Sequence, residues 1–373
     1  MKKQMMVNEI FFLRSVACLS IVFIHAIAIT LQSNHYSVSS FSYRFYDSMN
    51  ILLYFGTPMF IFISIFLLSF SYRNKEMPKN FLNKRLKLIY VPFIIMAFFY
   101  SIPYMSSFSD WGVKFVANAV IGDFHGYFVL IIFQFYVIYL LVHKQLKKMS
   151  PFKVISFAFL VNIAYLSFFN YTEPLSFPFA EYIWERFYWV PFVGWIFYFA
   201  VGYYSGLYFE KVVSYVKKYK NIVLFGPLLS SFILLYLYHN EILVIHSSKR
   251  IDILLHTTIV AMFLFLIATK IKNNIPSFLL TISKYSFGIY LLHFFYILAL
   301  QYVLNLISVS LPISISIFAL FSASIFLSIA TIQFLNQWNF GQYIVGKVGV
   351  GLKNNNLDNK SKKYREEHLK YSS

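Results

Sequence analysis

Long apolar stretches recur along the whole chain, and short segments rich in polar and charged residues separate them. A helix needs about 20 mainly apolar residues to cross the hydrocarbon core of a membrane, and ten stretches approach that length. The pattern therefore predicts an all-α, polytopic bundle of about ten transmembrane helices. The fourth span could also begin earlier, near Lys114, with a break over Gly122–Gly126. The predicted spans are Ile10–Leu31, Ile51–Tyr72, Leu88–Met105, Gly126–His143, Val154–Asn170, Tyr188–Phe209, Ile222–Tyr238, Ile251–Ile271, Ser277–Asn305 and Pro312–Phe334.

Composition excludes a soluble protein. Of 373 residues, 59% are hydrophobic, 21% are aromatic and 12% are charged, whereas soluble domains carry about 25% charged residues. One soluble core of this size could not enclose so much apolar surface, but lipid accepts apolar side chains on the outside of a bundle. Cys18 is the single cysteine, so neither an internal disulfide nor a cysteine metal site is expected, and no metal site is predicted.

The charge of the chain is distributed by membrane topology. The net charge of +18 would suit nucleic acid, but Lys and Arg lie in short clusters between apolar stretches, so membrane lipid rather than nucleic acid is the expected partner. With the N-terminus inside, 27 of the 32 basic residues fall on the cytoplasmic side. Both termini are therefore predicted to be cytoplasmic. The five basic residues left outside are Arg44, Lys114, Arg186, Lys249 and Arg250.

No second globular domain is expected. Residues 1–346 are predicted to form one transmembrane domain, and residues 347–373 form a polar tail, rich in Asn and Lys, that is predicted to be a disordered cytoplasmic segment.

The outer segments combine carboxylates with aromatic residues, and two interpretations remain open. One is an aromatic belt at the membrane interface with solvated acids beside it. The other is a rim that binds sugars, since aromatic faces and carboxylates suit polyhydroxylated ligands. The residues concerned are Asp47, Asp110, Asp123, Glu173, Glu181, Glu185, Glu241 and Asp252, with Trp111, Trp184 and Trp189.

The first predicted span carries Arg14 and His25. Eleven residues at about 100° each return to within about 20° of the starting direction, so both side chains share one face, roughly 16 Å apart along the axis. An ionisable group inside a span marks a functional site by default, and a histidine there could take a proton from a hydroxyl. The alternative is that Arg14 reaches lipid phosphates and that His25 is satisfied by a neighbouring helix.

Other polar residues have plainer alternatives. Ser286 and His293 share a face of the ninth span, where a lone histidine is more often structural. His125 lies at the outer mouth of the fourth span, where a solvated loop histidine is expected. The cluster Lys84, Arg85 and Lys87 is explained by topology alone, or it grips the phosphates of a cytosolic anionic donor.

Four stretches together resemble the acyltransferase 3 superfamily of membrane-bound acyltransferases. They are Leu13-Arg14-Ser15-Val16-Ala17 with His25, Phe55-Gly56-Thr57-Pro58-Met59-Phe60 with Ser64, Phe81-Leu82-Asn83-Lys84-Arg85 with Pro92, and Lys284-Tyr285-Ser286-Phe287-Gly288-Ile289-Tyr290-Leu291-Leu292-His293. Within it, the stretch Gly194-Trp195-Ile196-Phe197-Tyr198-Phe199 is similar to the intercellular adhesion protein C branch of poly-N-acetylglucosamine biosynthesis.

The resemblance implies an enzyme of the bacterial plasma membrane. Such proteins move an acyl group, acetyl or succinyl, from cytosolic acyl-CoA to a hydroxyl of a surface polysaccharide or its precursor, with acyl-CoA as co-substrate and no bound cofactor. His25 would then be the general base and Arg14 would hold the donor or an intermediate. The CoA phosphates would be held by Lys84, Arg85 and Lys87, and the secondary site candidates are His125, Ser286, Tyr290 and His293.

Two rival functions stay open at this stage. One is a transporter that exports a polysaccharide such as poly-N-acetylglucosamine, and the other is a non-catalytic partner of a polysaccharide synthase. A glycan pore needs many polar groups along its length, whereas Asn118, Gln134 and Asn162 are isolated in apolar sequence. The shared face of Arg14 and His25 therefore favours an enzyme.

Overall fold

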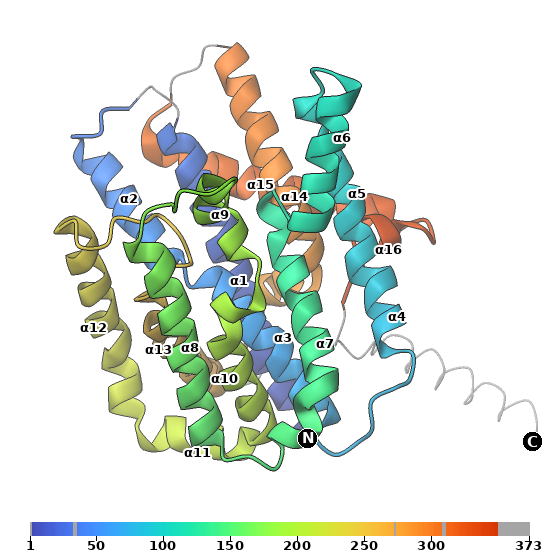
Figure 1. Ribbon diagram of the computed structural model, residues 1–373, viewed down its shortest axis with the longest axis vertical. Coiled ribbons are helices and arrows are strands. Elements are labelled where there is room, and N and C mark those ends of the chain that lie inside the picture. The colour runs from blue at the N-terminus through green and yellow to red at the C-terminus, as the bar shows by residue number, and fades with distance from the viewer. Residues whose placement is uncertain (1, 33–35, 272–273, 308–310, 350–373) are drawn as a thin grey trace, which may run out of the picture.

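The computed structural model describes residues 2–32, 36–271, 274–307 and 311–349. These residues form a bundle of helices, and no strand occurs among them (Figure 1). A helix satisfies its backbone polar groups within itself, which is what a lipid surrounding demands. The main helices of the bundle are α1 (Lys2–Gln32), α3 (Gly56–Tyr72), α7 (Phe128–Leu146), α8 (Pro151–Tyr171), α10 (Ile196–Leu207), α12 (Lys220–His239), α13 (Ile253–Ile271), α14 (Ser277–Leu306) and α15 (Ile313–Leu335).

Other helices join or extend the main ones. The remaining α-helices are α2 (Phe41–Leu53), α4 (Phe81–Arg85), α5 (Val91–Phe99), α6 (Phe108–Val116), α9 (Ala180–Glu185), α11 (Phe209–Lys218) and α16 (Gly341–Ile344). The tighter or wider helical turns are η1 (Leu86–Tyr90), η2 (Ile102–Tyr104), η3 (Ala117–Ile121), η4 (His125–Tyr127), η5 (Phe187–Trp189) and η6 (Phe192–Trp195).

The predicted count of spans is confirmed. In the described part of the chain, nine helical segments are long and apolar enough to cross a membrane, or ten when a bent pair is counted as one span. That bent pair, Ala180–Trp189 with Phe192–Leu207, turns by 46°, because Pro191 lacks an amide proton and disfavours helix in the residue before it. The chain is thus a multi-pass membrane protein.

Four predicted spans begin earlier than expected, among them the sixth, whose bent pair begins at Ala180 rather than Tyr188. The second span begins at Phe41 rather than Ile51, because α2 runs almost directly into α3. The third begins at Phe81, because α4 continues through η1 into α5. The fourth begins early, at Phe108, and Gly122 interrupts it as the alternative start predicted.

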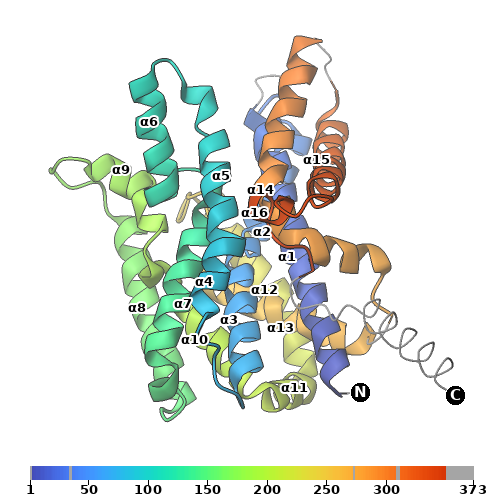
Figure 2. The ribbon, with the colours of Figure 1, turned by 90° about the vertical axis from the view of Figure 1, so that its right-hand side faces the viewer.

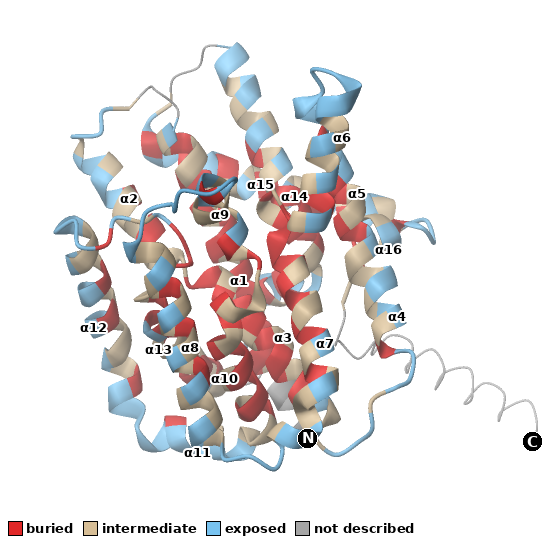
Figure 3. Ribbon diagram, in the orientation of Figure 1, coloured by how far each residue is buried: buried red, intermediate tan, exposed pale blue. Residues whose placement is uncertain are grey.

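Helix α1 lies at the centre of the bundle. It packs against α2, α3, α13, α14 and α15, and 72% of its apolar window is buried, against 17% for α8 and for α12. Figure 3 shows the buried residues concentrated on the inner helices, with exposed residues along α8 and α12. The exposed faces of α12 are apolar, with Phe225, Leu228 and Phe232 outward, as expected for helices that face lipid.

Helices α10 and α3 pack closely against each other. A Cβ atom built on Gly206 would stand 2.5 Å from the carbonyl oxygen of Phe66, so any larger residue would push the two helices apart. Lipid gives no hydrophobic gain when helices associate, and small residues allow the close van der Waals contact that replaces that gain.

Two of the three polar residues that seem isolated in sequence hold irregular backbone in place. Gln134 donates to the Val190 carbonyl at 2.8 Å and accepts from the Phe192 amide at 2.9 Å. Asn162 likewise donates to the Gly194 carbonyl at 2.9 Å. These bonds satisfy the backbone groups that the break before α10 leaves without helical partners.

Most basic clusters gather at one end of the bundle, here named the basic end. It comprises the connections α3–α4, α7–α8 and α10–α12, which lie together at the bottom of Figure 1. The helix α6, the start of α2 and the α8–α9 connection lie at the opposite end. Which end faces the cytoplasm stays a prediction from the charge distribution.

We expect Gln134→Ala to destabilise the fold. The substitution leaves two backbone groups beside Pro191 without partners, and each such group costs about 1–3 kcal/mol. Thermal unfolding in detergent should show a lower midpoint than for the native chain. Gln301→Ala is the matched control, because Gln301 bonds only to Asn305 one turn along the same helix; equal midpoints for the two variants would contradict the bracing role.

Candidate active site

Two cavities lie one beyond the other along α1. The first, of about 690 Å³, is lined by Arg14, and the second, of about 730 Å³, is lined by His25. Both volumes fall within the roughly 300–1,000 Å³ of small-molecule sites. Of the described residues, Tyr290 alone lines both cavities, so it stands at the partition between them.

The first cavity, here named the basic cavity, is lined by cations without carboxylates. Its described lining contains no Asp or Glu. Arg85 is placed there by α4, and its guanidinium lies 5.1 Å from the ring centre of Phe81 and 5.4 Å from that of Tyr136. The cations that line the basic cavity are Arg14, Lys84, Arg85, Lys284 and Lys347.

Two sequence expectations change at this cavity. Lys87 is exposed on η1 and does not line the basic cavity, because two residues of helix turn it away from Arg85. Lys347 and Gly349, at the start of the predicted tail, do line it, and the Gly349 amide donates to the Lys284 carbonyl at 3.1 Å. These residues follow α16, which lies against α5 (Figure 2). The rest of the predicted tail, from residue 350, lies outside the described residues.

Ser286 and Tyr290 come from one face of α14. Ser286 is buried and lines the basic cavity, and Cys18 of α1 contacts its carbonyl oxygen at 3.9 Å. Helix α14 therefore supplies one wall of the basic cavity and, through Tyr290, part of the partition.

Three histidines from three distant parts of the chain meet beside the second cavity, here named the histidine cavity. His25 and His125 line it, as does the more distant His246, and His293 packs against His25 and His125 without lining it. The ring centre of His25 lies 5.3 Å from that of His293 and 6.4 Å from that of His125. His125 and His293 are 5.5 Å apart, and Phe294 packs against both His25 and His125 at 5.0 and 5.1 Å. Sequence alone could not decide whether His293 reaches His25, and the packing of α14 on α1 places it there.

The expectation of a solvated His125 is wrong. Both ring nitrogens of His125 are buried, and neither has a hydrogen-bond partner among the described residues. The chain turns inward at Gly122, whose φ of +73° is the left-handed conformation that glycine adopts without strain. That turn carries His125 into the bundle, where its ring packs 4.5 Å from Tyr100.

Hydrogen bonds orient His293. Its Nδ1 lies 2.9 Å from the Ile289 carbonyl oxygen, and a carbonyl only accepts, so Nδ1 carries the proton and Nε2 of the neutral ring carries the lone pair. Nε2 is buried without a partner among the described residues. Tyr290 donates its hydroxyl proton to the His125 carbonyl. This bond links the side chain at the partition between the cavities to the backbone of His125.

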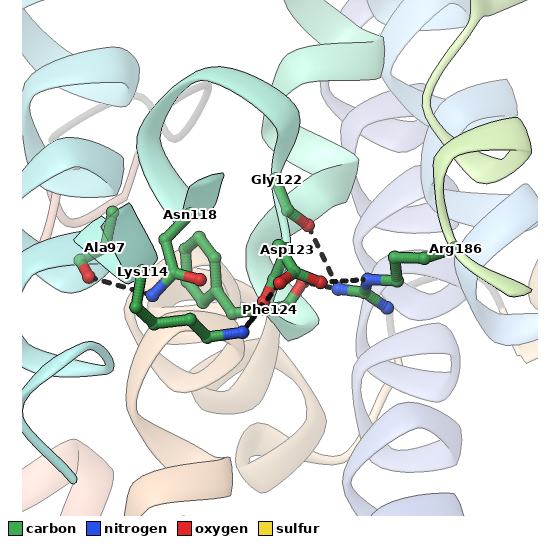
Figure 4. A network of polar contacts seen from close by, with 7 residues as sticks. All are labelled: Ala97, Lys114, Asn118, Gly122, Asp123, Phe124 and Arg186. Atoms are coloured by element: carbon green, nitrogen blue, oxygen red, sulfur yellow. Dashed lines mark hydrogen bonds and ion pairs between the residues drawn. The ribbon is translucent and has the colours of Figure 1, made fainter. Parts of the chain in front are cut away.

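A charged network fixes the outer rim of the histidine cavity. Asp123 accepts from Lys114 at 2.7 Å and from Arg186 at 3.1 Å, and Arg186 also donates to the carbonyls of Gly122 and Phe124 at 3.0 and 2.6 Å. Figure 4 shows this network, with the neighbouring bond from Asn118 to the Ala97 carbonyl. The network locks the turn that presents His125.

Lys249, between α12 and α13, is the least expected residue of this cavity. It is 5% exposed; its Nζ donates to the Tyr127 hydroxyl at 3.1 Å and lies 3.4 Å from the ring centre of Trp189. Burial, with the Arg186 guanidinium nearby, lowers the pKa of the Lys249 ammonium well below its usual value.

The sequence contained a signal for these missed residues. Five basic residues break the charge segregation, and three of them, Lys114, Arg186 and Lys249, line the histidine cavity. A fourth, Arg250, is buried against Asp252 at 2.7 Å, whereas Arg44 is exposed. A basic residue that departs from the predicted charge segregation is therefore a signal that the structure holds its side chain for a specific reason. Of the outer tryptophans, Trp189 lines this cavity, and Trp111 and Trp184 do not.

Comparisons with known proteins agree with this architecture. Residues 7–333 match the acyltransferase domain of the acyltransferase 3 type, and the chain belongs to this family. It is 37% identical over 359 residues to YfiQ of Bacillus subtilis, provisionally named a membrane-bound acyltransferase, covering 92% of this chain and 95% of that protein. No solved structure matches the chain.

Two further relatives carry a different provisional name, that of a poly-beta-1,6-N-acetyl-D-glucosamine export protein. The Staphylococcus aureus protein is 26% identical over 350 residues, covering 91% of this chain and 95% of that protein. The Staphylococcus epidermidis protein is 28% identical over 296 residues, covering 76% of this chain and 79% of that protein.

We expect Asp123→Ala to loosen the rim of the histidine cavity. The change leaves the partly buried cations Lys114 and Arg186 without their carboxylate, and lost hydrogen bonds to charged groups cost about 1.5–3 kcal/mol each. Thermal unfolding should show a lower midpoint, and limited proteolysis should cut faster near residue 122. Glu173→Ala, an exposed acid on the same end, should change stability by less than about 0.5 kcal/mol; an equal effect would refute the role of Asp123.

Proposed function

We propose that this protein is a membrane-bound O-acyltransferase that moves an acyl group, acetyl or succinyl, from acyl-CoA to a hydroxyl of a surface polysaccharide or its precursor. The observation that carries the proposal is the pair of cavities along α1, a cationic one and one beside a cluster of three histidines, which meet at Tyr290. Family membership supports the acyl chemistry. The arrangement gives a donor and an acceptor separate binding sites with one point of contact.

The basic cavity suits the donor. Coenzyme A carries several phosphate charges, and Arg and Lys are the side chains that bind phosphate, Arg through paired donors and Lys as a point charge. Arg14, Lys84 and Arg85 surround the cavity without a competing carboxylate. The phosphates would bind near Lys84 and Arg85, and the thioester would extend toward Tyr290.

The histidine cavity suits the acceptor. His25 lines it from α1, and in the proposed reaction its ring takes the proton of the acceptor hydroxyl as the oxygen attacks the thioester carbonyl. The carbon–sulfur bond breaks, an ester forms, and the proton passes from His25 to the departing CoA thiolate. The products are the acylated acceptor and CoA, and no other reactant is needed.

His293 and His125 act as positioning residues in this proposal. The bond from Nδ1 of His293 to the Ile289 carbonyl fixes that ring 5.3 Å from His25. His125 packs against Phe294, which also contacts His25. Rigid neighbours of this kind hold a base in one rotamer, and small misplacements of a base lower the rate strongly.

The polysaccharide acceptor is inferred from the rim and the relatives. Tyr127, Trp189, Asp47 and Asp123 line the histidine cavity, and this mix of aromatic faces and carboxylates suits sugars. The relatives named for poly-beta-1,6-N-acetyl-D-glucosamine export point to the same substrate class. With the basic end cytoplasmic, as the charge distribution predicts, cytosolic acyl-CoA would reach the basic cavity and the acceptor would arrive from outside.

Export of the polysaccharide is the second candidate function, and the names of the staphylococcal relatives favour it. An exporter would need a continuous polar path through the bundle. Asn118, Gln134 and Asn162 line neither cavity and bind backbone groups instead. Acyl transfer therefore remains the leading proposal. A polysaccharide synthase would then be a partner that supplies the acceptor.

We expect His25→Ala to lower the acyl content of surface polysaccharide severely. Removal of a general base costs about 10²- to 10⁴-fold in rate. Acyl groups per sugar should be measured in the cell-surface fraction, and the total exported polysaccharide should be measured in parallel. His239→Ala is the control, because His239 is exposed and bonds to Ser48 outside both cavities.

The two readouts separate the candidate functions. Full acylation in His25→Ala cells that make normal amounts of protein would disprove the general-base role. If export collapses while the exported fraction keeps its normal acyl content, the transporter function is correct instead.

We expect Arg85→Ala to raise the KM for acyl-CoA by about 10- to 100-fold, because a charge-assisted hydrogen bond contributes about 1.5–3 kcal/mol. The KM for the acceptor should stay the same. Initial rates with purified protein in lipid nanodiscs measure both constants. Lys87→Ala is the control, since Lys87 lies outside the basic cavity; an equal rise in both variants would mean that the cluster acts only through its overall charge.

A further inference from the structure

Lys249 is a buried cation without an acidic partner in the wall of the histidine cavity. Its Nζ contacts the Tyr127 hydroxyl and the face of the Trp189 ring. No carboxylate of the described residues lies within ion-pair distance of it. An ammonium has three protons to donate, and Tyr127 accepts only one of them.

The carboxylates of the cavity are already committed elsewhere. The acids that line it are Asp47 and Asp123. Asp123 pairs with both Lys114 and Arg186, so one negative charge serves two cations. Asp47 accepts from the Tyr238 hydroxyl at 2.7 Å and lies 3.6 Å from His246. When Lys249 is protonated, the cavity wall therefore has an excess of positive charge, centred on Lys249.

The excess is concentrated on one aromatic ring. The Arg186 guanidinium carbon lies 4.4 Å from the ring centre of Trp189, and the Lys249 Nζ lies 3.4 Å from the same centre. Cation–π contact offsets part of the cost of burying each charge. It does not neutralise either charge, and a buried cation without a counter-ion is destabilising. An anion supplied by a ligand would remove that cost.

We propose that Lys249, with Arg186 and Tyr127, forms a subsite for a negatively charged group on the acceptor, a carboxylate or a phosphate. This inference rests on the proposed function in one respect, namely that the acceptor occupies the histidine cavity. It narrows the acceptor from polysaccharides in general to those that carry an anionic group near the acylated hydroxyl. Trp189 and Tyr127 would pack against the sugar ring that carries the charge.

Two sources could supply this anion. It could be an acidic sugar within the glycan, or the phosphate of a lipid-linked precursor. Both present oxygens that accept charge-assisted hydrogen bonds from Lys249, and such bonds are about twice as strong as neutral ones. A probe that carries carboxylates and a probe that carries a phosphate distinguish the two sources.

The test is a binding measurement on the full chain in lipid nanodiscs without acyl-CoA. Hyaluronan tetrasaccharide presents carboxylates, N-acetylglucosamine 1-phosphate presents a phosphate, and fully N-acetylated chitotetraose, called chitotetraose below, is the neutral oligosaccharide. We expect the native protein to bind at least one anionic probe about 10- to 100-fold more tightly than chitotetraose, the range expected for one charge-assisted hydrogen bond. The preferred probe identifies the source of the charge.

Variants assign the preference to Lys249. Lys249→Met replaces the ammonium with an unbranched apolar side chain that is one atom shorter, and it should abolish the anionic preference while leaving chitotetraose affinity unchanged. Lys249→Arg keeps the charge and should retain most of the preference. Arg44→Met removes an exposed cation at the same end and should change nothing. Since Lys249→Met replaces a buried unpaired charge with an apolar group, its unfolding midpoint should equal or exceed that of the native chain.

Several results would overturn the subsite. Equal affinity of the native protein for all three probes would do so, and so would an anionic preference that survives in Lys249→Met. If Lys249→Met lost only the transfer of succinyl from succinyl-CoA, with acetyl transfer and probe binding unchanged, the anionic group that Lys249 binds would belong to the acyl group instead. Because binding is measured without acyl transfer, a failed acylation assay with intact anion binding would refute the proposed function and leave the subsite standing.

Discussion

The burial of α1 is the constraint on which the rest of the structure depends. This helix carries Arg14 and His25 through the apolar depth of the bundle, and ionisable side chains at that depth are stable only when protein or a polar cavity surrounds them. Helices α2, α3, α13, α14 and α15 provide that surrounding. By packing on α1, α14 also brings Ser286 and Tyr290 to the two cavities and His293 beside His25. The same contacts that shield the polar face thus assemble the candidate active site.

Irregular backbone inside the bundle is the second consequence. The chain departs from α-helix around Gly122 and around Pro191, and lipid tolerates such breaks only where protein covers them or a cavity lies beside them. Gln134 and Asn162 satisfy the freed groups at the second break. Both breaks border the histidine cavity, where they present His125 and Trp189. These two breaks weaken the spans in which they lie. They also direct inward two side chains that an uninterrupted helix could not place there.

The two cavities differ in charge in a way that follows from topology. The basic cavity lies at the end where lysine and arginine accumulate and has no carboxylate among its described lining residues. The histidine cavity lies toward the other end, where cations are few and are held individually by Asp123, Trp189 and Tyr127. The wall of the basic cavity, with several cations, suits a donor that carries several phosphates. The wall of the histidine cavity, with cations held at fixed positions, suits a ligand that carries a single charged group. The proposed donor and acceptor follow this division.

The sequence by itself determined the helical fold, the approximate number of spans, the clustering of basic residues and the shared face of Arg14 and His25. These depend on the length of apolar stretches and on the helical period, which are local properties. It also carried the resemblance that the family match confirmed. Only the tertiary structure decided that the ring nitrogens of His125 are buried, that His293 lies beside His25, that Lys87 points away from the basic cavity and that Lys249 has no acidic partner among the described residues. Those facts depend on which helices touch and where the chain turns inward, and in lipid such contacts are set by shape and small residues rather than by a hydrophobic pattern that sequence displays.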